Sequence, residues 1–447
     1  MQLTILGGGG FRVPLVYGAL QSDHCDLRVD RVVLHDVDPE RLSAVERVLA
    51  QMRDTAGGPA VRSGTHLDDA LGGADFVFSA MRIGGLAGRT ADERVALDLG
   101  LLGQETTGPG GVAYGLRTVP AAVHVAERVR AVAPGAWVIN FTNPAGMITE
   151  AMQSVLDSRV IGICDTPVGL GRRAARALDL DPTRATFDYA GINHLGWLRS
   201  LPIDGADALP RLLEDPQRLS TIEEGRLFGV EWLHDLGMIP GEYLYYYYFT
   251  RDAISSIKGG PQTRGELLLD QQSTFYQEVC HHPDAALATW RAARQARDAT
   301  YMKESRSEGE ERDAADVAGG GYEAVALALM TALARDEPTH QILNVRNGST
   351  LPGLPPDAVV EVPCVVDSSG ATPTRIAQLT GHPAGLVQQV KAVEQLTIRA
   401  ALEGSERLAR MALALHPLVD SVTVARILLQ GYRERIPSLD EVFHSNG

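Results

Sequence analysis

Short apolar runs alternate with stretches of helical periodicity along the first third of the chain. The apolar runs have the length of strands and fall at residues 3–7, 31–35, 74–80, 137–142 and 160–164. The helical patterns between them fall at residues 12–20, 117–132 and 144–155. Alternation of this kind predicts a mostly parallel sheet with helices on both faces and right-handed connections.

The pattern changes after about residue 170. Residues 187–201 predict a strand or hairpin, and residues 342–366 predict a pair of strands around Pro352–Pro356. Long helical stretches are predicted at residues 263–300, 321–334, 384–403 and 418–434. Residues 303–316 are heavily charged, so we expect them to be exposed. This half of the chain therefore predicts a helix-rich α+β region.

The composition is that of a globular protein, since 45% of the 447 residues are hydrophobic and 22% are charged. The length allows two domains that share an interface. The net charge of −15 argues against nucleic acids and anionic membranes as partners. A local cluster of arginines still permits a phosphorylated substrate.

Three features of the sequence indicate a cytoplasmic protein. The chain has no run of 18 or more apolar residues, so no transmembrane helix is predicted. The N-terminus enters a strand directly, without the basic segment and cleavage pattern of a signal peptide. The four cysteines are far apart and form no CxxC motif, which favours free thiols; they are Cys25, Cys164, Cys280 and Cys364.

Four glycines, Gly7-Gly8-Gly9-Gly10, follow the first predicted strand, and Phe11 and Arg12 lead into the next helix. Glycines at such a turn let backbone N–H groups approach a pyrophosphate. Asp36 ends the second predicted strand, where a carboxylate binds the ribose hydroxyls of NAD and disfavours NADP. Arg12 stands where the dinucleotide fingerprint has Gly or Ala, so a glycine-rich turn without a ligand remains the alternative.

Cys164 and His194 are candidate metal ligands. Cys164 closes a predicted strand, and open α/β sheets bind ligands at the carboxyl ends of their strands. A thiolate and an imidazole can share a divalent ion and leave positions open for substrate oxygens. Two ligands are weak evidence by themselves, because a buried cysteine and a hydrogen-bonded core histidine are commoner.

Residues 241–248 contain a run of tyrosines that includes Tyr243. Four successive tyrosines splay around a helix, so some of them face a cleft or an interface. An aromatic packing cluster is the alternative to a catalytic role.

Arg82, Arg89 and Arg94 follow a predicted strand. Arginines in this position can bind a phosphate through two parallel hydrogen bonds. Surface salt bridges to Asp92 and Glu93 are the alternative.

These segments together resemble glycoside hydrolase family 4, the NAD- and divalent-metal-dependent glycosidases, over most of the chain. Six ordered motifs carry the resemblance: Gly7–Gly10, Arg82–Gly85, Gly103–Gly111, Asn140–Pro144, Cys164–Pro167 and Asn193–Trp197. The resemblance implies an α/β protein with a Rossmann-like NAD-binding domain at residues 1–168. It also implies a helix-rich α+β domain at residues 169–447, built like the C-terminal domain of lactate and malate dehydrogenases. That second domain would carry substrate, metal and subunit contacts of a homodimer or homotetramer.

Within the family, later segments are most similar to 6-phospho-β-glucosidases: Gly320–Glu323, Asn344–Gly348, Leu354–Pro363 and His416–Val419. This similarity implies hydrolysis of a phosphorylated disaccharide or glycoside, such as cellobiose 6-phosphate. Asp165 follows the candidate metal cysteine, and family members that act on α-linked substrates often carry an acid there. A 6-phospho-α-glucosidase or an α-galacturonidase-like hydrolase therefore stays an alternative.

The resemblance also implies a redox-neutral reaction. NAD takes a hydride from C3 of the sugar and returns it after the aglycone has left and water has added at C1. Cys164 and His194 hold the metal, usually Mn²⁺, which stabilises the enolate. Tyr243 is the implied base for the C2 proton, with Tyr245 or Tyr247 as the next candidates. Asp165 is the implied acid for the leaving oxygen.

Similarity to the family places three further residues at the substrate. Arg89 and Asn143 are implied near the phosphate or hydroxyls, and Arg264 is implied as a second phosphate contact. Glu105 lies in the loop between the cofactor and the metal, without an assigned role.

Two hypotheses of another class remain. A 2-hydroxy-acid dehydrogenase of the lactate/malate type suits the N-terminal half but needs no cysteine–histidine metal site. The second hypothesis is a regulatory protein that binds NAD and a sugar phosphate without catalysis. The complete set of Cys164, His194 and Tyr243 argues against it.

Overall fold

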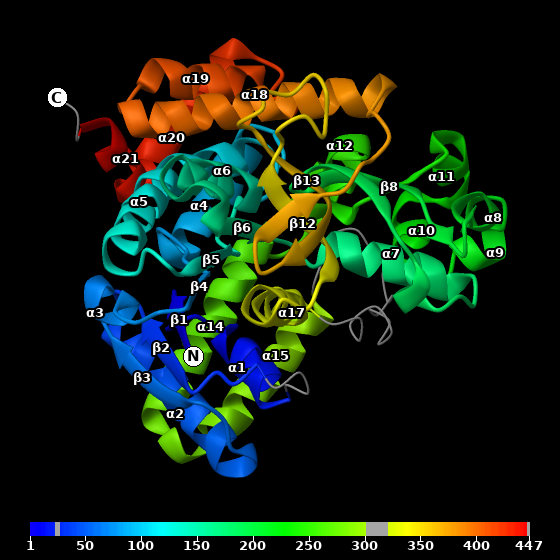
Figure 1. The fold of residues 1–447 in the computed structure, drawn as a ribbon. Coiled ribbons are helices and arrows are strands. Elements are labelled where there is room, and N and C mark those ends of the chain that lie inside the picture. Colours follow the sequence, from blue (N-terminus) through cyan, green and yellow to red (C-terminus); the bar gives the residue numbers. More distant parts are fainter. Residues whose placement is uncertain (23–26, 301–320, 445–447) are drawn as a thin grey trace.

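The structure is a computed structural model that describes residues 1–22, 27–300 and 321–444. A sheet of twelve strands runs through the centre of these residues, and helices cover both of its faces (Figure 1). The N-terminal part of the sheet is parallel and the remainder is antiparallel.

The parallel part has the strand order of a dinucleotide-binding fold. Its strands are β1 (Gln2–Leu6), β2 (Arg31–His35), β3 (Ala60–Gly64), β4 (Phe76–Ser79), β5 (Trp137–Asn140) and β6 (Val160–Ile163). In space they run β3-β2-β1-β4-β5-β6, and each neighbouring pair is parallel. The order reverses between β1 and β4, and open α/β sheets bind ligands at such a point.

Helices on the two faces of this sheet explain why its inner strands are mostly apolar. These helices are α1 (Val13–Gln21), α2 (Pro39–Ala56), α3 (Leu67–Leu71), α4 (Gly85–Asp98), α5 (Pro109–Val132) and α6 (Ala145–Leu156). Phe76 and Phe78 of β4 join a core with α1 and α2, whereas Val77 joins a core with α5 and α6. Both faces of a parallel sheet are buried in this way, so both sets of side chains are apolar.

The antiparallel part extends the same sheet. Its strands are β7 (Asp188–Ile192), β8 (Leu195–Ser200), β11 (Ile239–Pro240), β12 (Thr339–Arg346), β13 (Val359–Asp367) and β14 (Gly370–Pro373). Beyond β6 the order is β12-β13-β7-β8-β11, with β14 paired to β13. β12 joins the two parts, because Leu343 pairs with Ile163 and Asn344 pairs with Gly162. Strands β9 (Pro202–Ile203) and β10 (Ala206–Asp207) form a separate small sheet.

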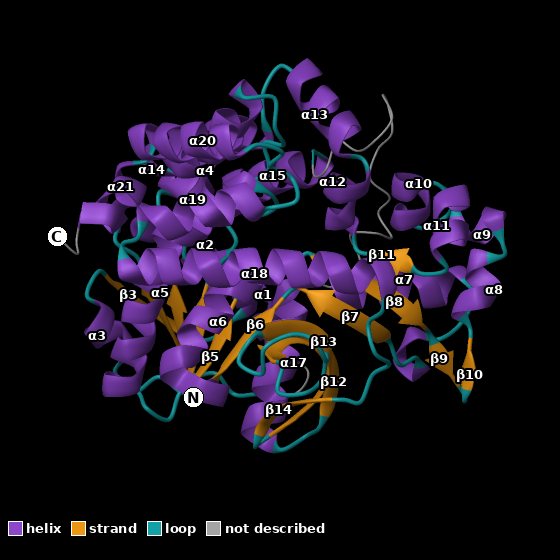
Figure 2. Cartoon of the chain, turned by 90° about the horizontal axis from the view of Figure 1, so that it is seen from above, coloured by secondary structure: helices purple, strands orange, loops and turns teal. Residues whose placement is uncertain are grey.

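The remaining helices surround the antiparallel part and the outer face of the parallel part. They are α7 (Thr166–Ala177), α8 (Leu209–Leu213), α9 (Pro216–Leu219), α10 (Glu223–Phe228), α11 (Val230–Leu236), α12 (Tyr245–Tyr248), α13 (Thr250–Gly259), α14 (Arg264–His281), α15 (Ala286–Ala299), α17 (Tyr322–Arg335), α18 (Gly381–Glu403), α19 (Glu406–Leu415), α20 (Val422–Arg435) and α21 (Pro437–His444). The long helix α18 packs on α5, α6 and β7, so it spans both parts of the sheet (Figure 2).

The structure confirms the predicted α/β class, and it differs from the predicted elements in several places. Helix α5 begins at Pro109 rather than at residue 117, because glycines obscure the helical pattern in its first turns. The predicted helix at 263–300 is two helices, which break at His282-Pro283. The sequence analysis also missed α2, α4, α7 and β3. The charged stretch 303–316 lies outside the described residues.

The division into two domains at residue 168 stays a prediction, and the sheet is continuous across that point. Within residues 1–22, 27–300 and 321–444, no helix is both long enough and apolar enough to cross a membrane. Cys164, Cys280 and Cys364 are free thiols, and Cys25 lies outside the described residues.

Candidate active site

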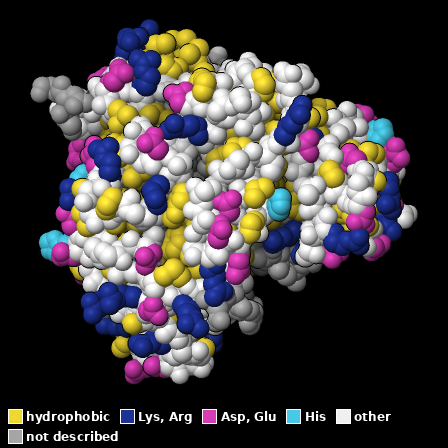
Figure 3. Space-filling view, viewed as in Figure 1, with side chains coloured by type: hydrophobic (Ala, Val, Ile, Leu, Met, Phe, Trp, Pro, Cys, Tyr) yellow, Lys and Arg dark blue, Asp and Glu magenta, His cyan; other side chains and the backbone are white. Residues whose placement is uncertain are grey.

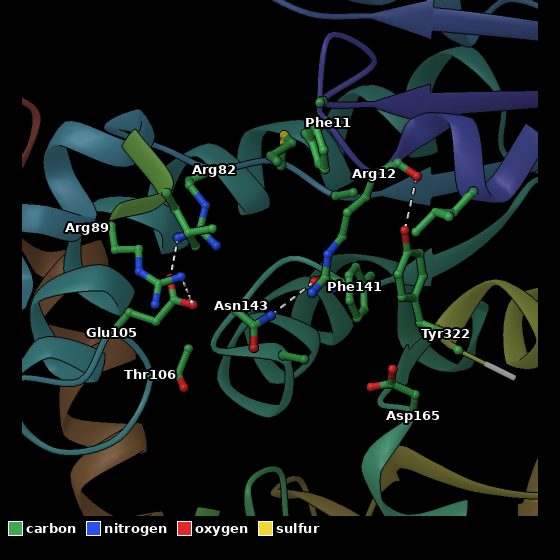
Figure 4. Close-up of a pocket in the computed structure, with 18 of the residues that line it drawn as sticks. Phe11, Arg12, Arg82, Arg89, Glu105, Thr106, Phe141, Asn143, Asp165 and Tyr322 are labelled. Carbon is green, nitrogen blue, oxygen red and sulfur yellow. Dashed lines mark hydrogen bonds and ion pairs between the residues drawn. The ribbon is translucent and has the colours of Figure 1, made fainter. Parts of the chain in front are cut away.

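A cavity of about 710 Å³ opens at the carboxyl ends of the parallel strands. Gly7 follows β1, Ala80 follows β4 and Cys164 follows β6, and all three line it. His194 and Tyr243 contribute from the antiparallel part of the chain. Most of the residues singled out from the sequence line this cavity: Gly7, Gly10, Phe11, Arg12, Asp36, Arg89, Asn143, Cys164, Asp165, His194, Tyr243 and Arg264 (Figure 4).

The glycine loop lies close against the sheet. Gly7 has φ of +80°, and a Cβ atom there would lie 2.5 Å from the carbonyl oxygen of Ala80. Gly8 and Gly9 are not among the residues that line the cavity, because they face the protein. A Cβ atom on Gly8 would lie 2.7 Å from the Cβ atom of Leu34. Side chains at these positions would push the loop off the sheet, so glycine is required for α1 to begin at the cavity.

Asp36 directly follows β2 and faces the cavity. Its Oδ2 accepts a hydrogen bond of 3.0 Å from the backbone N–H of Gly9, and Oδ1 accepts one of 3.2 Å from Asp38. An ionised carboxylate has about four acceptor positions, so it retains capacity for ribose hydroxyls. This position agrees with the predicted role of Asp36, which stays a prediction.

Cys164 and His194 reach the cavity from different strands. Cys164 follows β6 directly, and His194 lies in the turn between β7 and β8 with φ of +63°. Nδ1 of His194 is 3.1 Å from Oγ1 of Thr106, so Nε2 is the nitrogen suited to a metal ion. No group of three or more His, Cys, Asp or Glu side chains that could hold a metal is present within the described residues. A thiol and an imidazole are ligand types that suit a divalent metal, and the role of this pair as metal ligands stays a prediction.

Burial acts on the protonation of both candidate ligands. It lowers the pKa of His194 to about 4, against the opposing charge of Glu105, so the imidazole is neutral near pH 7. A neutral imidazole is the form that binds metal. Burial, followed by the negative charges of Glu361 and Asp165, raises the pKa of the Cys164 thiol. The thiolate therefore needs a bound cation to form.

Tyr243 contacts His194 directly. The two rings stack with centroids 3.7 Å apart and planes 8° from parallel. Tyr243 belongs to the 3₁₀ turn Glu242–Leu244, which precedes α12. Of the next candidates in the run, Tyr245 and Tyr247 are not among the residues that line the cavity, whereas Tyr246 lines it. Tyr246 therefore replaces Tyr245 and Tyr247 as the next candidate base after Tyr243.

Glu105 connects two arginines of the cavity wall. Its carboxylate pairs with Arg82 and lies 2.8 Å from Nη1 of Arg89, whose Nε is 2.8 Å from Glu93 (Figure 4). Burial alone would raise the pKa of Glu105, but the charges of Arg82 and Arg89 outweigh burial and lower it to about 2. Arg89 thus lines the cavity. It also forms a salt bridge with Glu93, which the sequence analysis named as the alternative to phosphate binding.

Arg12, Arg264 and Arg297 form a second cationic group on the cavity wall. Nη2 of Arg264 donates a 3.0 Å hydrogen bond to the carbonyl oxygen of Arg297 at the end of α15. Burial, with the like charges of Arg12 and Arg264, lowers the pKa of Arg297 to about 9. Like charges held this close together favour the binding of an anion.

Asn143 also lines the cavity and lies between Glu105 and Arg12 in Figure 4. Its Nδ2 donates to the carbonyl oxygen of Phe141 at 3.4 Å. Its buried Oδ1 has no hydrogen-bond partner among the described residues. A substrate hydroxyl that donated to this oxygen would satisfy it.

Asp165 is the N-cap residue of α7, and in the described structure its side chain makes no capping hydrogen bond. It lines the cavity on the side of Tyr322, away from Arg82 and Glu105 (Figure 4). The carboxyl group is therefore placed toward the cavity rather than toward its own helix.

Sequence reasoning missed Thr106, Tyr322 and Arg297 as cavity residues. The hydroxyl of Tyr322 donates to the carbonyl oxygen of Arg12 at 3.1 Å, and its ring stacks on Phe141 with centroids 4.1 Å apart. Thr106 and Tyr322 lie in the motifs Gly103–Gly111 and Gly320–Glu323, but the motifs alone did not assign them to the cavity, and Arg297 lies in no recognised motif. Arg94 instead pairs with Glu266 and is not among the residues that line the cavity.

The fold and the cavity together define an enzyme of the dinucleotide-binding class with a thiol–imidazole pair at the same site. The family 4 glycosyl hydrolase model matches residues 2–180, and the model of the family's C-terminal domain matches residues 189–419. The chain belongs to glycoside hydrolase family 4, which confirms the resemblance seen in the sequence.

Individual relatives extend over almost the whole chain. A probable 6-phospho-β-glucosidase of Bacillus subtilis (strain 168) is 32% identical over 439 residues, which cover 96% of this chain and 94% of the relative. The 6-phospho-β-glucosidase of Thermotoga maritima, solved with manganese, NAD+ and glucose-6-phosphate, has a TM-score of 0.81 at 27% identity over 97% of this chain and 98% of that chain. A 6-phospho-α-glucosidase from gut microorganisms, solved with NAD and Mn²⁺, has a TM-score of 0.79 at 25% identity over 97% of each chain.

The malate dehydrogenase of Plasmodium falciparum, solved with NADH, shares the fold alone, with a TM-score of 0.51 at 13% identity over 90% of this chain and 98% of that chain. This likeness confirms the predicted resemblance to dehydrogenase architecture. The chain itself is a glycoside hydrolase, so the hypothesis of a 2-hydroxy-acid dehydrogenase is not supported.

Proposed function

We propose that this protein hydrolyses 6-phospho-β-glucosides in a redox-neutral reaction that depends on NAD and a divalent metal, with Mn²⁺ as the expected ion. One observation carries the proposal: Cys164, His194 and Tyr243 line the same cavity as the glycine loop and Asp36. The relative from Thermotoga maritima, solved with manganese, NAD+ and glucose-6-phosphate, supports this combination of ligands.

The residues have separate tasks in this proposal. When bound, NAD would accept and return a hydride, and the metal would stabilise negative charge on the sugar oxygens. Cys164 and His194 would hold the metal, and Asp36 would orient the ribose of NAD. Tyr243 would remove the C2 proton, and Asp165 would protonate the leaving oxygen.

The arginines of the cavity wall support a phosphorylated substrate, although seven Asp and Glu side chains among the described residues line the same cavity. Although the chain carries a net charge of −15, the described part of it contributes eight arginines to the cavity wall: Arg12, Arg41, Arg82, Arg89, Arg173, Arg264, Arg294 and Arg297. NAD brings a pyrophosphate and the substrate brings a further phosphate, so two anionic groups need cations here. We assign Arg264 and Arg89 to the substrate phosphate or hydroxyls, and Asn143 to a sugar hydroxyl.

A 6-phospho-α-glucosidase is the second candidate, and Asp165 is the observation that favours it. Asp165 directly follows Cys164 and lines the cavity. Its side chain makes no capping hydrogen bond in the described structure, so helix capping does not explain the acid at this position. The β preference is supported by the relative from Bacillus subtilis at 32% identity, and the α alternative by the solved 6-phospho-α-glucosidase at 25%.

A panel of nitrophenyl glycosides tests the proposal. The protein would be incubated with NAD, Mn²⁺ and a thiol reductant, and nitrophenol release measured from α- and β-glucosides with and without a 6-phosphate, and from an α-galacturonide. We expect release from the 6-phospho-β-glucoside alone. Preferential release from the 6-phospho-α-glucoside would establish the alternative. Cleavage of unphosphorylated substrates only would contradict a role for the arginines in phosphate binding.

We also propose that the protein is a homodimer or homotetramer. Several exposed apolar side chains lie on the C-terminal helices α18, α19 and α20: Leu402, Met411, Leu415, Val422 and Ile427. Figure 3 shows apolar side chains gathered over α19, on a face where acidic and basic side chains are otherwise interspersed. Sedimentation analysis of the purified protein would contradict this proposal if it showed a monomer at all concentrations.

A further inference from the structure

Glu361 is a fully buried carboxylate in the middle of the sheet, and the reaction described above does not use it. It lies on β13 and is 1% exposed. Its neighbours across the sheet are Asn344 on β12 and Gly191 on β7. A buried carboxylate is retained only where hydrogen bonds or cations compensate for the loss of water.

Three side chains converge on this carboxylate. Oε1 accepts hydrogen bonds from Nδ2 of Asn344 at 2.9 Å and from Nδ2 of Asn193 at 3.2 Å. Oε2 accepts one of 3.3 Å from the hydroxyl of Tyr189. All three donors are themselves buried. The Glu361 carboxylate therefore accepts hydrogen bonds from β7, from the turn that follows β7 and from β12.

The strands that carry these donors also lead to the two candidate metal ligands. β7 ends just before the turn that holds Asn193 and His194, and β6 ends just before Cys164. Between β7 and β6 the sheet contains only β13 and β12, which carry Glu361 and Asn344. Asn344 pairs in register with Gly162 of β6. The hydrogen bonds of Glu361 therefore link the His194 turn to β12, and β12 pairs with β6, the strand that leads to Cys164.

The turn at His194 needs such support. A φ of +63° is uncommon for a residue other than glycine, and it persists only where neighbouring contacts fix it. The first turn of α6 adds rigidity from the other side, because a Cβ atom on Gly146 would lie 3.0 Å from the Cβ atom of Asn193. Asn193 is thus held between α6 and Glu361.

We propose that Glu361 is a positioning residue that fixes the His194 turn relative to Cys164 and so sets the geometry of the metal site. This inference rests on the proposed function, which supplies the metal. Glu361 itself does not need to touch the ion or the substrate. Residues that orient metal ligands through hydrogen bonds typically change metal affinity about 10–100-fold when they are replaced.

The test is the affinity of the NAD-saturated protein for Mn²⁺ without substrate, measured from the electron paramagnetic resonance signal of free Mn²⁺. Glu361→Met keeps roughly the length of the side chain but offers no oxygen acceptor to the three donors. We expect it to weaken Mn²⁺ binding about 10–100-fold at constant pH. Val362→Ala is the matched control, because Val362 is a buried neighbour on the same strand and belongs to the hydrophobic core. It should lower the melting temperature and leave Mn²⁺ affinity within about twofold of the wild type.

The outcomes separate this inference from the proposed function. A wild-type protein that does not bind Mn²⁺ would overturn both. Wild-type affinity in Glu361→Met, or equal weakening in Val362→Ala, would overturn the positioning role alone. If Glu361→Met does not fold, Asn193→Ala decides, since it removes the bond between Glu361 and the His194 turn. Unchanged Mn²⁺ affinity in that variant would also overturn the inference.

Discussion

The imidazole of His194 and the phenol of Tyr243 lie face to face, with ring centroids 3.7 Å apart and planes 8° from parallel. The candidate metal ligand and the candidate base are therefore fixed relative to each other by direct contact. The stack depends on the aromatic ring of Tyr243 and not on its hydroxyl. Removal of the hydroxyl alone thus separates a catalytic role from a packing role.

Tyr243→Phe should stop the exchange of the substrate C2 proton with deuterated solvent. The phenylalanine ring preserves the contact with His194, and loss of a general base usually costs about 10²–10⁴-fold in rate. Exchange would be followed by nuclear magnetic resonance in the presence of NAD and Mn²⁺. Binding of NAD should be unchanged, because Asp36 and the glycine loop are intact.

Exchange at the wild-type rate in Tyr243→Phe would assign the base to another residue. Tyr246 would then be the next residue to replace, because it lines the cavity whereas Tyr245 and Tyr247 are not among the lining residues.

Cys164→Ser and His194→Ala should each abolish Mn²⁺-dependent turnover while the protein remains folded. In this account Cys164 and His194 are the two metal ligands that the protein supplies. The loss of either should therefore reduce turnover by more than the roughly 10–100-fold effect of replacing a residue that only orients a ligand. Circular dichroism would check the fold, and Mn²⁺ titration would check the site. Near-normal Mn²⁺-dependent rates in one variant would remove that residue from the metal site.

The stability of the protein should fall as the pH is lowered from 7 to 5, in part because of His416. Burial lowers the pKa of this histidine to about 3 in the folded protein, below the value of about 6.5 expected after unfolding. The unfolded chain therefore takes up a proton below pH 6.5 that the folded chain does not, and folding loses up to about 2 kcal/mol at pH 5. Above pH 6.5 this contribution is absent.

Urea unfolding at pH 7, 6 and 5 measures this effect. His416→Asn should flatten the decline, since asparagine has no proton to gain and its oxygen can accept the N–H of Leu418, which now donates to Nδ1 at 3.1 Å. His340→Asn, at an exposed position, is the control and should follow the wild type. Parallel pH curves for His416→Asn and the wild type would contradict the assignment.

The sequence predicted five of the six strands of the parallel part, because each of these five is a short, largely apolar run that is mostly buried. It predicted the break between α14 and α15 poorly, since both helices have similar periodicity and only His282-Pro283 marks the boundary. The strand β3 was missed because its residues are mostly polar or exposed. The local pattern of apolar and polar residues therefore predicted buried strands better than the strand at the edge of the sheet.

For the site, the sequence predicted residues that lie in glycine-rich or otherwise recognisable segments. Gly7, Asp36, Cys164 and His194 are of this kind, and the cavity contains all four. Arg297 reaches the cavity from α15, whose pattern carries no chemical signal. Tyr322 reaches it from α17, in the motif Gly320–Glu323, which indicated a family resemblance but no role for the tyrosine. The network of Glu361 depends on strand register, which no local pattern reveals.

The measurement that tests the account most directly is the stoichiometry of NAD during substrate cleavage. The protein would be given Mn²⁺, an amount of NAD equal to its own concentration and a large excess of 6-phospho-β-glucoside, with NADH followed by absorbance. The account predicts that sugar phosphate forms over many turnovers without accumulation of NADH, and that none forms without NAD. One NADH formed for each substrate consumed would show a net oxidation and contradict the redox-neutral hydrolysis proposed for this site.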